Sequence, residues 1–280
     1  MIGAFDSGHG GLTVLHTLRQ QLGARSFLYL GDHANAPYGD RSPEEIYDLT
    51  IAGVERLFAE GCRLVILACN TASAIALRRL QQTWLPHRFA DHRVLGVLVP
   101  MVEAITGVPW MADVAGGVVG TVRKVAIFAT RRTVESDAYP REIGKRAPAV
   151  QVMQQACPDL ARQIEQGADR SLLKASVERY VGELLERNEG ALPDAAMLGC
   201  THYPLVQDLF RAALPDRIDL LSQPELVARS LAAYLQRHPE FDAPQAHGTL
   251  RFLTTGEPAQ VAGVAQRFFE APVQFEKVGR

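Results

Sequence analysis

Two short stretches of this sequence share one layout, in which an apolar, strand-like run leads to a cysteine and then to a helix-like segment. The runs are residues 64–67 and 195–198, and the cysteines are Cys69 and Cys200. Open α/β sheets place their chemistry where a buried parallel strand ends in a turn and opens a helix. The layout therefore predicts an α/β fold with a thiol at the carboxyl end of two different strands.

Strand-like and helix-like segments alternate along the rest of the chain, which indicates an α/β fold class with mostly parallel sheets. The clearest helix start has Ser42 as the cap, Pro43 in the first helical position and Glu45 completing a capping box. The expected strands are residues 2–5, 26–30, 64–68, 94–99, 125–129, 195–198, 218–221, 250–253 and an edge strand at 273–275. The expected helices are residues 12–22, 43–60, 71–82, 158–166, 170–187, 224–236 and 258–269.

Composition excludes several classes of protein. The length of 280 residues favours two domains, and the formal charge of −2 gives nucleic-acid binding no support. The apolar runs are too short to span a membrane, and the start lacks a basic region, so we expect neither a membrane anchor nor a signal peptide. Four widely spaced cysteines without a C-x-x-C pair argue against disulfides and structural zinc. A cytoplasmic protein without a metal is expected.

The two turns suit proton transfer at carbon. A thiol beside backbone N–H groups and a helix N-terminus is shifted toward its thiolate form, and its reference pKa is about 8.5. A thiolate and a thiol on opposite sides of one substrate can remove one proton and deliver another. Cys62 and Cys157 lack polar neighbours in the sequence and are expected in the core. The turn with Gly8, Gly10 and Gly11 does not fit G-x-G-x-x-G, which disfavours a dinucleotide site.

Five blocks of the sequence resemble the signatures of glutamate racemases, in the order of that family. The resemblance runs from the N-terminus to about residue 235. The blocks are Ile2-Gly3-Ala4-Phe5-Asp6-Ser7-Gly8-His9-Gly10-Gly11-Leu12, Pro37-Tyr38-Gly39, Ala68-Cys69-Asn70-Thr71-Ala72, Ala129-Thr130-Arg131-Arg132-Thr133 with Ser136 and Tyr139, and Leu198-Gly199-Cys200-Thr201-His202-Tyr203-Pro204-Leu205.

The resemblance implies an enzyme without cofactor that interconverts L- and D-glutamate and supplies D-glutamate for peptidoglycan. Cys69 would be the base toward one enantiomer, expected to be D-glutamate, and Cys200 toward the other. The residues expected to assist the thiols are Asp6 and His202, with Asp32 and Glu165 as weaker candidates. The residues expected to hold the substrate are Ser7, Asn70, Thr71 and Thr201 at the amino and α-carboxylate groups, the loop Pro37, Tyr38 and Gly39 at the side-chain carboxylate, and Thr130 and Thr133 nearby.

The family fold consists of two similar doubly wound α/β domains with the active site in the cleft between them. We expect the first domain at residues 1–98 plus 209–280 and the second at 99–208, with Pro100 as a candidate boundary. A homodimer is the assembly expected from the family. This chain departs from the family pattern at His9, at a longer stretch over 106–120, and at Ser222-Gln223-Pro224.

Other interpretations stay open on the residues alone. Asp6, Thr130 and Thr133 could be helix caps, the glycines could only shape a turn, and Tyr38 could simply stack on its loop. A related two-thiol enzyme could act on aspartate or another small acid. A binding protein could keep the cleft without turnover, and a metal or redox protein could use the cysteines. Exchange of the Cα hydrogen separates the racemase from the last two.

Overall fold

The computed structural model describes residues 1–109, 124–243 and 248–279. It divides into a first unit, residues 1–97 with 224–280, and a second unit, residues 98–223. The chain returns to the first unit at Pro224 rather than at residue 209, because β8 (Asp219–Leu221) pairs with β7 (Ala195–Gly199) of the second unit. In the described part of the chain, no helix is long and apolar enough to cross a membrane.

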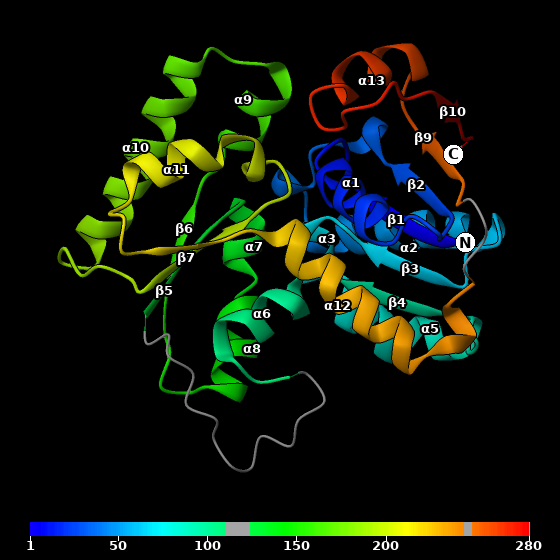
Figure 1. The fold of residues 1–280 in the computed structure, drawn as a ribbon, viewed down its shortest axis with the longest axis horizontal. Helices are drawn as coiled ribbons and strands as arrows, with labels where there is room; N and C mark the ends of the chain where they lie inside the picture. Colours follow the sequence, from blue (N-terminus) through cyan, green and yellow to red (C-terminus); the bar gives the residue numbers. More distant parts are fainter. Residues whose placement is uncertain (110–123, 244–247, 280) are drawn as a thin grey trace. The chain divides into compact units, whose positions relative to one another are not determined.

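The first unit is built on a six-stranded sheet in the order β10-β9-β2-β1-β3-β4 (Figure 1). Every pairing in it is parallel, which confirms the predicted class of sheet. The central strands β1, β2 and β3 are buried along their whole length, as strands covered on both faces must be. The strands are β1 (Ile2–Asp6), β2 (Phe27–Gly31), β3 (Leu64–Leu67), β4 (Arg93–Gly96), β9 (Leu250–Thr254) and β10 (Phe275–Lys277).

Helices connect the successive strands of the first unit. The predicted capping box of α2 is confirmed, with Ser42 and Glu45 bonding each other's backbone. The helix expected over residues 71–82 continues to Arg88, and residues 80–84 form a π-helical turn within it. The helices are α1 (Gly11–Gln21), α2 (Pro43–Ala59), α3 (Asn70–Ile75), α4 (Leu77–Arg79), α5 (Leu85–Arg88), α12 (Gln223–Arg237) and α13 (Pro258–Ala265).

The second unit has a four-stranded, all-parallel sheet in the order β6-β5-β7-β8. Its strands are β5 (Lys124–Ala129), β6 (Gln151–Ala156), β7 and β8. Its helices are α6 (Leu98–Thr106), α7 (Arg131–Glu135), α8 (Ala138–Arg146), α9 (Leu160–Gln166), α10 (Arg170–Arg187) and α11 (Gln207–Ala213). The predicted helix over 170–187 is confirmed.

One predicted strand is too long, and the sequence pattern missed β6, α6 and α8. Residues 94–99 were expected to be one strand, but β4 ends at Gly96 and α6 begins at Leu98. Pro100 stands in the first turn of α6, where its missing N–H costs nothing. β6 contains three glutamines and is a sheet edge, so it lacks the apolar run of a central strand. Most of the stretch 106–120 lies outside the described residues.

In both units the order in which successive strands are added to the sheet reverses near its middle. In the first unit β2 lies on one side of β1 and β3 on the other, and in the second unit β6 and β7 flank β5 in the same way. Because crossover connections are right-handed, consecutive helices then fall on opposite faces of the sheet. The crevice at the carboxyl ends of the strands where the order reverses is the usual ligand site of such folds. In this chain those points lie between β1 and β3, and between β5 and β7.

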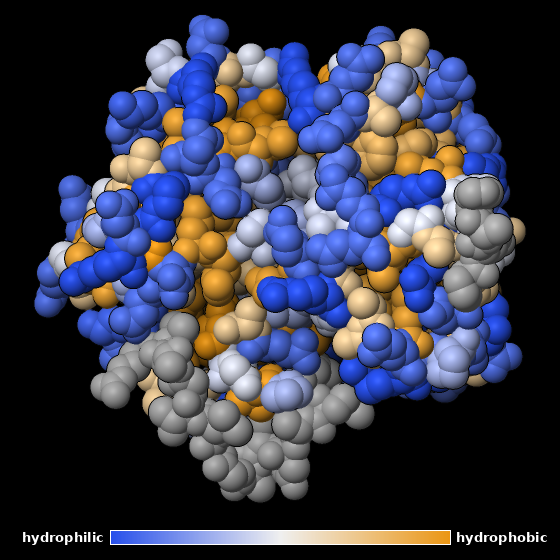
Figure 2. All heavy atoms as spheres, in the orientation of Figure 1, coloured by the Kyte–Doolittle hydropathy of each residue, from blue (hydrophilic) through white to orange (hydrophobic). Residues whose placement is uncertain are grey.

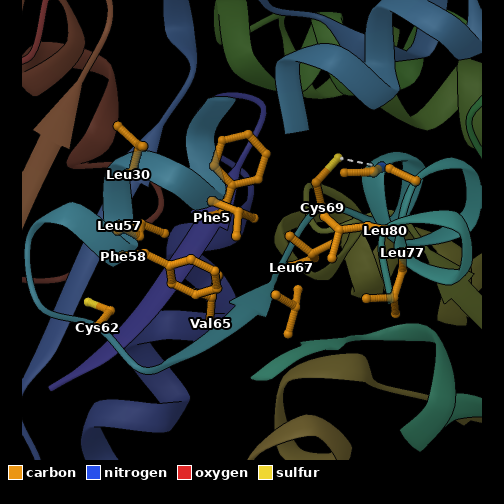
Figure 3. Packing of buried hydrophobic residues seen from close by; sticks show 14 of the residues in the cluster. Phe5, Leu30, Leu57, Phe58, Cys62, Val65, Leu67, Cys69, Leu77 and Leu80 are labelled. Atoms are coloured by element: carbon orange, nitrogen blue, oxygen red, sulfur yellow. Dashed lines mark hydrogen bonds between the residues drawn. The ribbon is translucent and has the colours of Figure 1, made fainter. Parts of the chain in front are cut away.

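The two cysteines of the first unit lie at opposite ends of β3, and the packing of the core explains why Cys62 is inert. Figure 3 shows Phe5, Leu57, Phe58 and Val65 packed together, with Cys62 near the start of β3 and Cys69 beyond its end. Burial raises the pKa of Cys62 to about 12, so this thiol stays protonated and inert near neutral pH. The position of Cys62 agrees with the core role predicted for it.

The surface carries few large apolar side chains. Figure 2 shows mostly polar residues on the visible face, with apolar residues grouped between them. Among the described residues, the large hydrophobic side chains that are exposed are Leu172 and Leu205, both in the second unit.

Candidate active site

In the first unit, candidate site residues gather at the carboxyl ends of three adjacent parallel strands. Asp6 ends β1, Asp32 follows β2 and Cys69 follows β3. All three are buried, as is Tyr38 on the loop after β2. We call Asp6, Ser7, Asp32, Tyr38 and Cys69 the Cys69 site. It occupies the point where the strand order reverses.

Backbone and hydroxyl groups surround the Cys69 thiol. Cys69 is the N-cap of α3, and its Sγ accepts a hydrogen bond from the Ala72 N–H at 3.4 Å, the dashed line in Figure 3. The thiol lies 3.4 Å from Ser7 Oγ. Asn70 and Thr71 form the first turn of α3, and both are buried. An N–H directed at sulfur at the start of a helix stabilises negative charge there.

The glycine turn after β1 holds the Asp6 carboxylate. Its Oδ1 accepts a hydrogen bond from the Gly8 N–H at 2.8 Å. A Cβ placed on Gly11 would come within 2.6 Å of the Asp6 Cβ, so only glycine fits at the start of α1. The turn therefore has a structural reason for Gly11 and also presents Ser7 to Cys69.

Asp32 lies against Tyr38 on the loop after β2. Tyr38 donates a hydrogen bond from its hydroxyl to Asp32 Oδ2 at 2.7 Å. Burial, and then the Asp32 carboxylate, raise the pKa of Tyr38 well above its usual value, with smaller effects from Cys69 and Asp6. Pro37 is exposed and Gly39 is half-buried, so the loop 37–39 offers backbone to a ligand while the ring of Tyr38 stays inside.

In the second unit, Cys200 follows β7 and is supported by charge. His202 Nδ1 lies 3.8 Å from Cys200 Sγ, and His202 Nε2 lies 2.8 Å from Glu165 Oε2 of α9. Burial lowers the pKa of His202, but the hydrogen bonds to Cys200 and Glu165 outweigh it and raise that pKa to about 10. We call Glu165, Cys200, Thr201 and His202 the Cys200 site. Its histidine is an imidazolium at neutral pH.

Thr130 is the N-cap of α7 at the end of β5, beside β7 in the sheet, and Thr133 lies within that helix. The Thr133 N–H donates to Thr130 Oγ1 at 3.3 Å, and the two hydroxyl oxygens lie 3.0 Å apart. Ser136 donates its hydroxyl to the Thr133 carbonyl at 2.6 Å. The capping alternative left open by the sequence is thus present, and it leaves Thr130 half-buried at the switch point of the sheet.

Some contacts at the two sites involve residues that the sequence did not single out as site residues. Asn35 and Thr255 both bond the Asp32 carboxylate, and Gln223 bonds the buried Tyr139, whose pKa is raised by burial. Thr255 follows a predicted strand, and a polar residue at such a position is a usable signal. The sequence could not show that this strand lies next to β2. Cys157 is fully buried with its pKa raised by burial, as its core assignment predicts.

In the described part of the chain, no cluster of three His, Cys, Asp or Glu side chains is arranged to hold a metal ion. The candidate residues instead form two separate thiol sites, one in each unit. Each thiol stands at the carboxyl end of a parallel strand, beside the point where the strand order reverses.

Residues 9–230 match the family of Asp/Glu/Hydantoin racemases. The chain belongs to this family. It is 52% identical to a glutamate racemase of Phenylobacterium zucineum, over 98% of this chain and 99% of the relative. It is 51% identical to one of Paracoccus denitrificans, over 98% of each.

Solved structures of glutamate racemases share the fold. The isoform RacE1 of Bacillus anthracis superimposes with a TM-score of 0.86 at 29% identity, covering 100% of this chain and 97% of that one. The Francisella tularensis enzyme, solved in complex with D-glutamate, gives a TM-score of 0.83 at 26% identity, over 99% and 97%. An aspartate racemase of Picrophilus torridus gives 0.52 at 15% identity, over 86% and 99%, a likeness of fold alone.

Proposed function

We propose that this chain is a racemase that interconverts L-glutamate and D-glutamate. Relatives about half identical over nearly their whole length carry this name, and the family motifs of the chain fall at the two thiol sites. The observation that carries the proposal is the pair of strand-end thiols, Cys69 and Cys200, each with its own support for negative charge.

The proposed reaction is a two-base proton transfer. One cysteine, as thiolate, takes the Cα proton and becomes a thiol, and the C–H bonding pair stays on carbon. The other cysteine, as thiol, gives its proton to the opposite face of that carbon and becomes a thiolate. Nothing is oxidised or reduced, and the reverse reaction exchanges the two roles. The reaction requires both thiols to act on opposite faces of one carbon.

The acid-base roles follow from the surroundings of each thiol. His202 contacts the sulfur of Cys200 through Nδ1, and Glu165 holds the ring in place through Nε2. At Cys69 the Ala72 N–H and the start of α3 favour the thiolate. From the family resemblance, we assign Cys69 to the proton of D-glutamate and Cys200 to that of L-glutamate.

The carbanion-like charge needs fixed donors around the α-carboxylate. Ser7, Asn70 and Thr71 supply hydroxyl and amide groups at the Cys69 site, and Thr201 supplies one beside Cys200. We propose the backbone of the loop 37–39 for the side-chain carboxylate, with Thr130 and Thr133 nearby. Asp6 is fixed by the glycine turn and lies close enough to Tyr38 for its charge to raise the pKa of that residue.

Aspartate is the second candidate substrate, because the family includes aspartate racemases. Glutamate is favoured by the near-full-length similarity to glutamate racemases. We further propose a cytoplasmic enzyme, with a homodimer as its assembly, whose product serves peptidoglycan synthesis.

The test follows L- and D-glutamate by proton NMR in heavy water without added cofactor, with chiral analysis of both enantiomers. We expect deuterium to appear first in the product enantiomer, because the two bases exchange separately with solvent. Cys69→Ser and Cys200→Ser should each lower racemisation by about 10³-fold or more. Cys62→Ala, which changes an inert thiol of the core, is the matched control and should retain activity.

Three outcomes would contradict parts of this proposal. Exchange of aspartate but not glutamate would keep the mechanism and overturn the substrate. Binding of glutamate without exchange would indicate a silent relative. Full activity in either serine variant would remove that thiol from the mechanism.

A further inference from the structure

A strand from the C-terminal part of the chain reaches the Cys69 site through hydrogen bonds. β9 pairs with β2 in parallel register, with Thr254 opposite Gly31. The residues that follow these strands, Thr255 and Asp32, therefore meet at the same edge of the sheet. Thr255 donates its hydroxyl to Asp32 Oδ1 at 2.7 Å, across 223 positions of sequence.

The Asp32 carboxylate is occupied on both oxygens. Oδ1 accepts from Thr255 and from Asn35 Nδ2 at 2.9 Å, and Oδ2 accepts from the Tyr38 hydroxyl at 2.7 Å and from the same amide at 3.1 Å. Asp32 is 5% exposed and Tyr38 is 1% exposed. A carboxylate engaged in this way holds the groups that are bonded to it in place.

Thr255 also fixes the start of the loop. Its hydroxyl oxygen accepts from the Ala34 N–H at 3.0 Å, and its own N–H donates to the Gly31 carbonyl at 3.2 Å. The hydroxyl thus uses both its donor and its acceptor on the segment between β2 and Tyr38. Arg41 closes the other end of this segment by bonding the Asn35 carbonyl at 2.5 Å.

We infer that Thr255 is a positioning residue for the substrate loop 37–39, acting through Asp32 and Tyr38. Asp32 is then the anchor of this loop. The inference rests on the proposed function, in which this loop meets the side-chain carboxylate of glutamate. Loosening the chain Thr255–Asp32–Tyr38 displaces the loop and weakens substrate binding, while the thiols and their partners are untouched.

The primary test is Thr255→Val, which keeps the shape of the side chain and removes the hydroxyl. We expect KM for both enantiomers to rise about tenfold, the effect of losing a hydrogen bond to a charged group, with kcat within about twofold. Thr255→Ser restores the hydroxyl and should restore KM. The matched control is Thr50→Val, which removes a buried hydroxyl bonded to the Ile46 carbonyl within α2.

A second pair of variants tests the chain itself and does not depend on Thr255→Val folding well. Tyr38→Phe removes the other end of the chain and should raise KM to a similar extent. Thr255→Ser with Tyr38→Phe should match Tyr38→Phe alone, and Thr255→Val with Tyr38→Phe should fall short of the product of the two single effects. Thermal melting of every variant accompanies the kinetics.

The outcomes separate this inference from the proposed function. If the wild type racemises glutamate and Thr255→Val keeps its KM, the inference is wrong and the function stands. A loss of kcat at constant KM, or a Thr255→Ser variant as weak as Thr255→Val, also overturns it. If the wild type does not racemise glutamate, calorimetric titration of D-glutamate decides, and about tenfold weaker binding by Thr255→Val supports the positioning role.

Discussion

The two thiol sites occupy equivalent places in their sheets, yet they stabilise sulfur charge by different physical means. At Cys69 the support is a backbone N–H of α3, and the thiol donates a hydrogen bond to Ser7 Oγ at 3.4 Å. At Cys200 it is an imidazolium held by a carboxylate. Backbone dipoles do not titrate, whereas His202 does. The comparison teaches that the groups that stabilise charge on Cys69 do not change with pH. The group that stabilises charge on Cys200 does.

The largest difference should appear in His202→Asn. Because the two enantiomers have equal free energy, kcat/KM must fall equally in both directions, and we expect about 10²-fold. The primary isotope effect with Cα-deuterated substrate shows which of the two proton-transfer steps the substitution slows. It should rise from L-glutamate, where Cys200 removes the deuteron, and fall from D-glutamate, where Cys69 removes it. Ser7→Ala, the matched change beside Cys69, should give a smaller loss with the opposite pattern. Equal isotope effects in both directions would break the comparison.

A smaller effect is expected for Glu165→Gln, which keeps a hydrogen-bond partner and removes its charge. Activity should fall about tenfold, and the pKa of His202 should drop from about 10 toward its ordinary value of 6.5. The folded pKa lies above the unfolded one. The stabilisation by His202 is therefore complete below pH 6.5 and is lost as pH rises through about 10 in the wild type, or through a lower pH in the variant. NMR titration of the imidazole measures the shift, and an unchanged pKa would remove Glu165 from the pair.

The smallest effect concerns stability. Serine is a better helix N-cap than most residues, so Cys69→Ser should leave the free energy of unfolding unchanged or raise it by up to about 1 kcal/mol. Cys200→Ser removes the sulfur beside a buried imidazolium and should lower it by about 1–2 kcal/mol. Urea unfolding at pH 7 of both variants checks this. Equal losses in both variants would mean that the two thiols are supported alike.

Much of the architecture could be predicted from local patterns. The capping box of α2 and the span of α10 were read from residue types and spacing, because those signals act within a few residues. β6 was missed because an edge strand needs no apolar run. The strand expected to reach residue 99 stops at Gly96 because α6 begins at Leu98, and an apolar segment of this length fits either state.

The candidate site divides in the same way. Family motifs contain both thiols and His202, and the resemblance added Asp32 and Glu165 as weaker candidates, but neither could say which side chains touch. Asp32 was expected to assist a thiol, which stays a prediction, and the structure shows it bonded to Tyr38 and Thr255. Glu165 lies 37 positions from His202, and only the packing of α9 near the end of β7 brings them together.

The sequence by itself determined most of the elements, the two thiol turns and the class of chemistry, because these depend on residue types that are neighbours along the chain. The tertiary structure alone decided the partners of each charged group: His202 with Glu165, and Asp32 with Tyr38 and Thr255. Strand order sets those partners, since parallel strands far apart in sequence end at one edge of a sheet. The order β9-β2-β1-β3 is a property of the whole packed sheet, and no local pattern contains it.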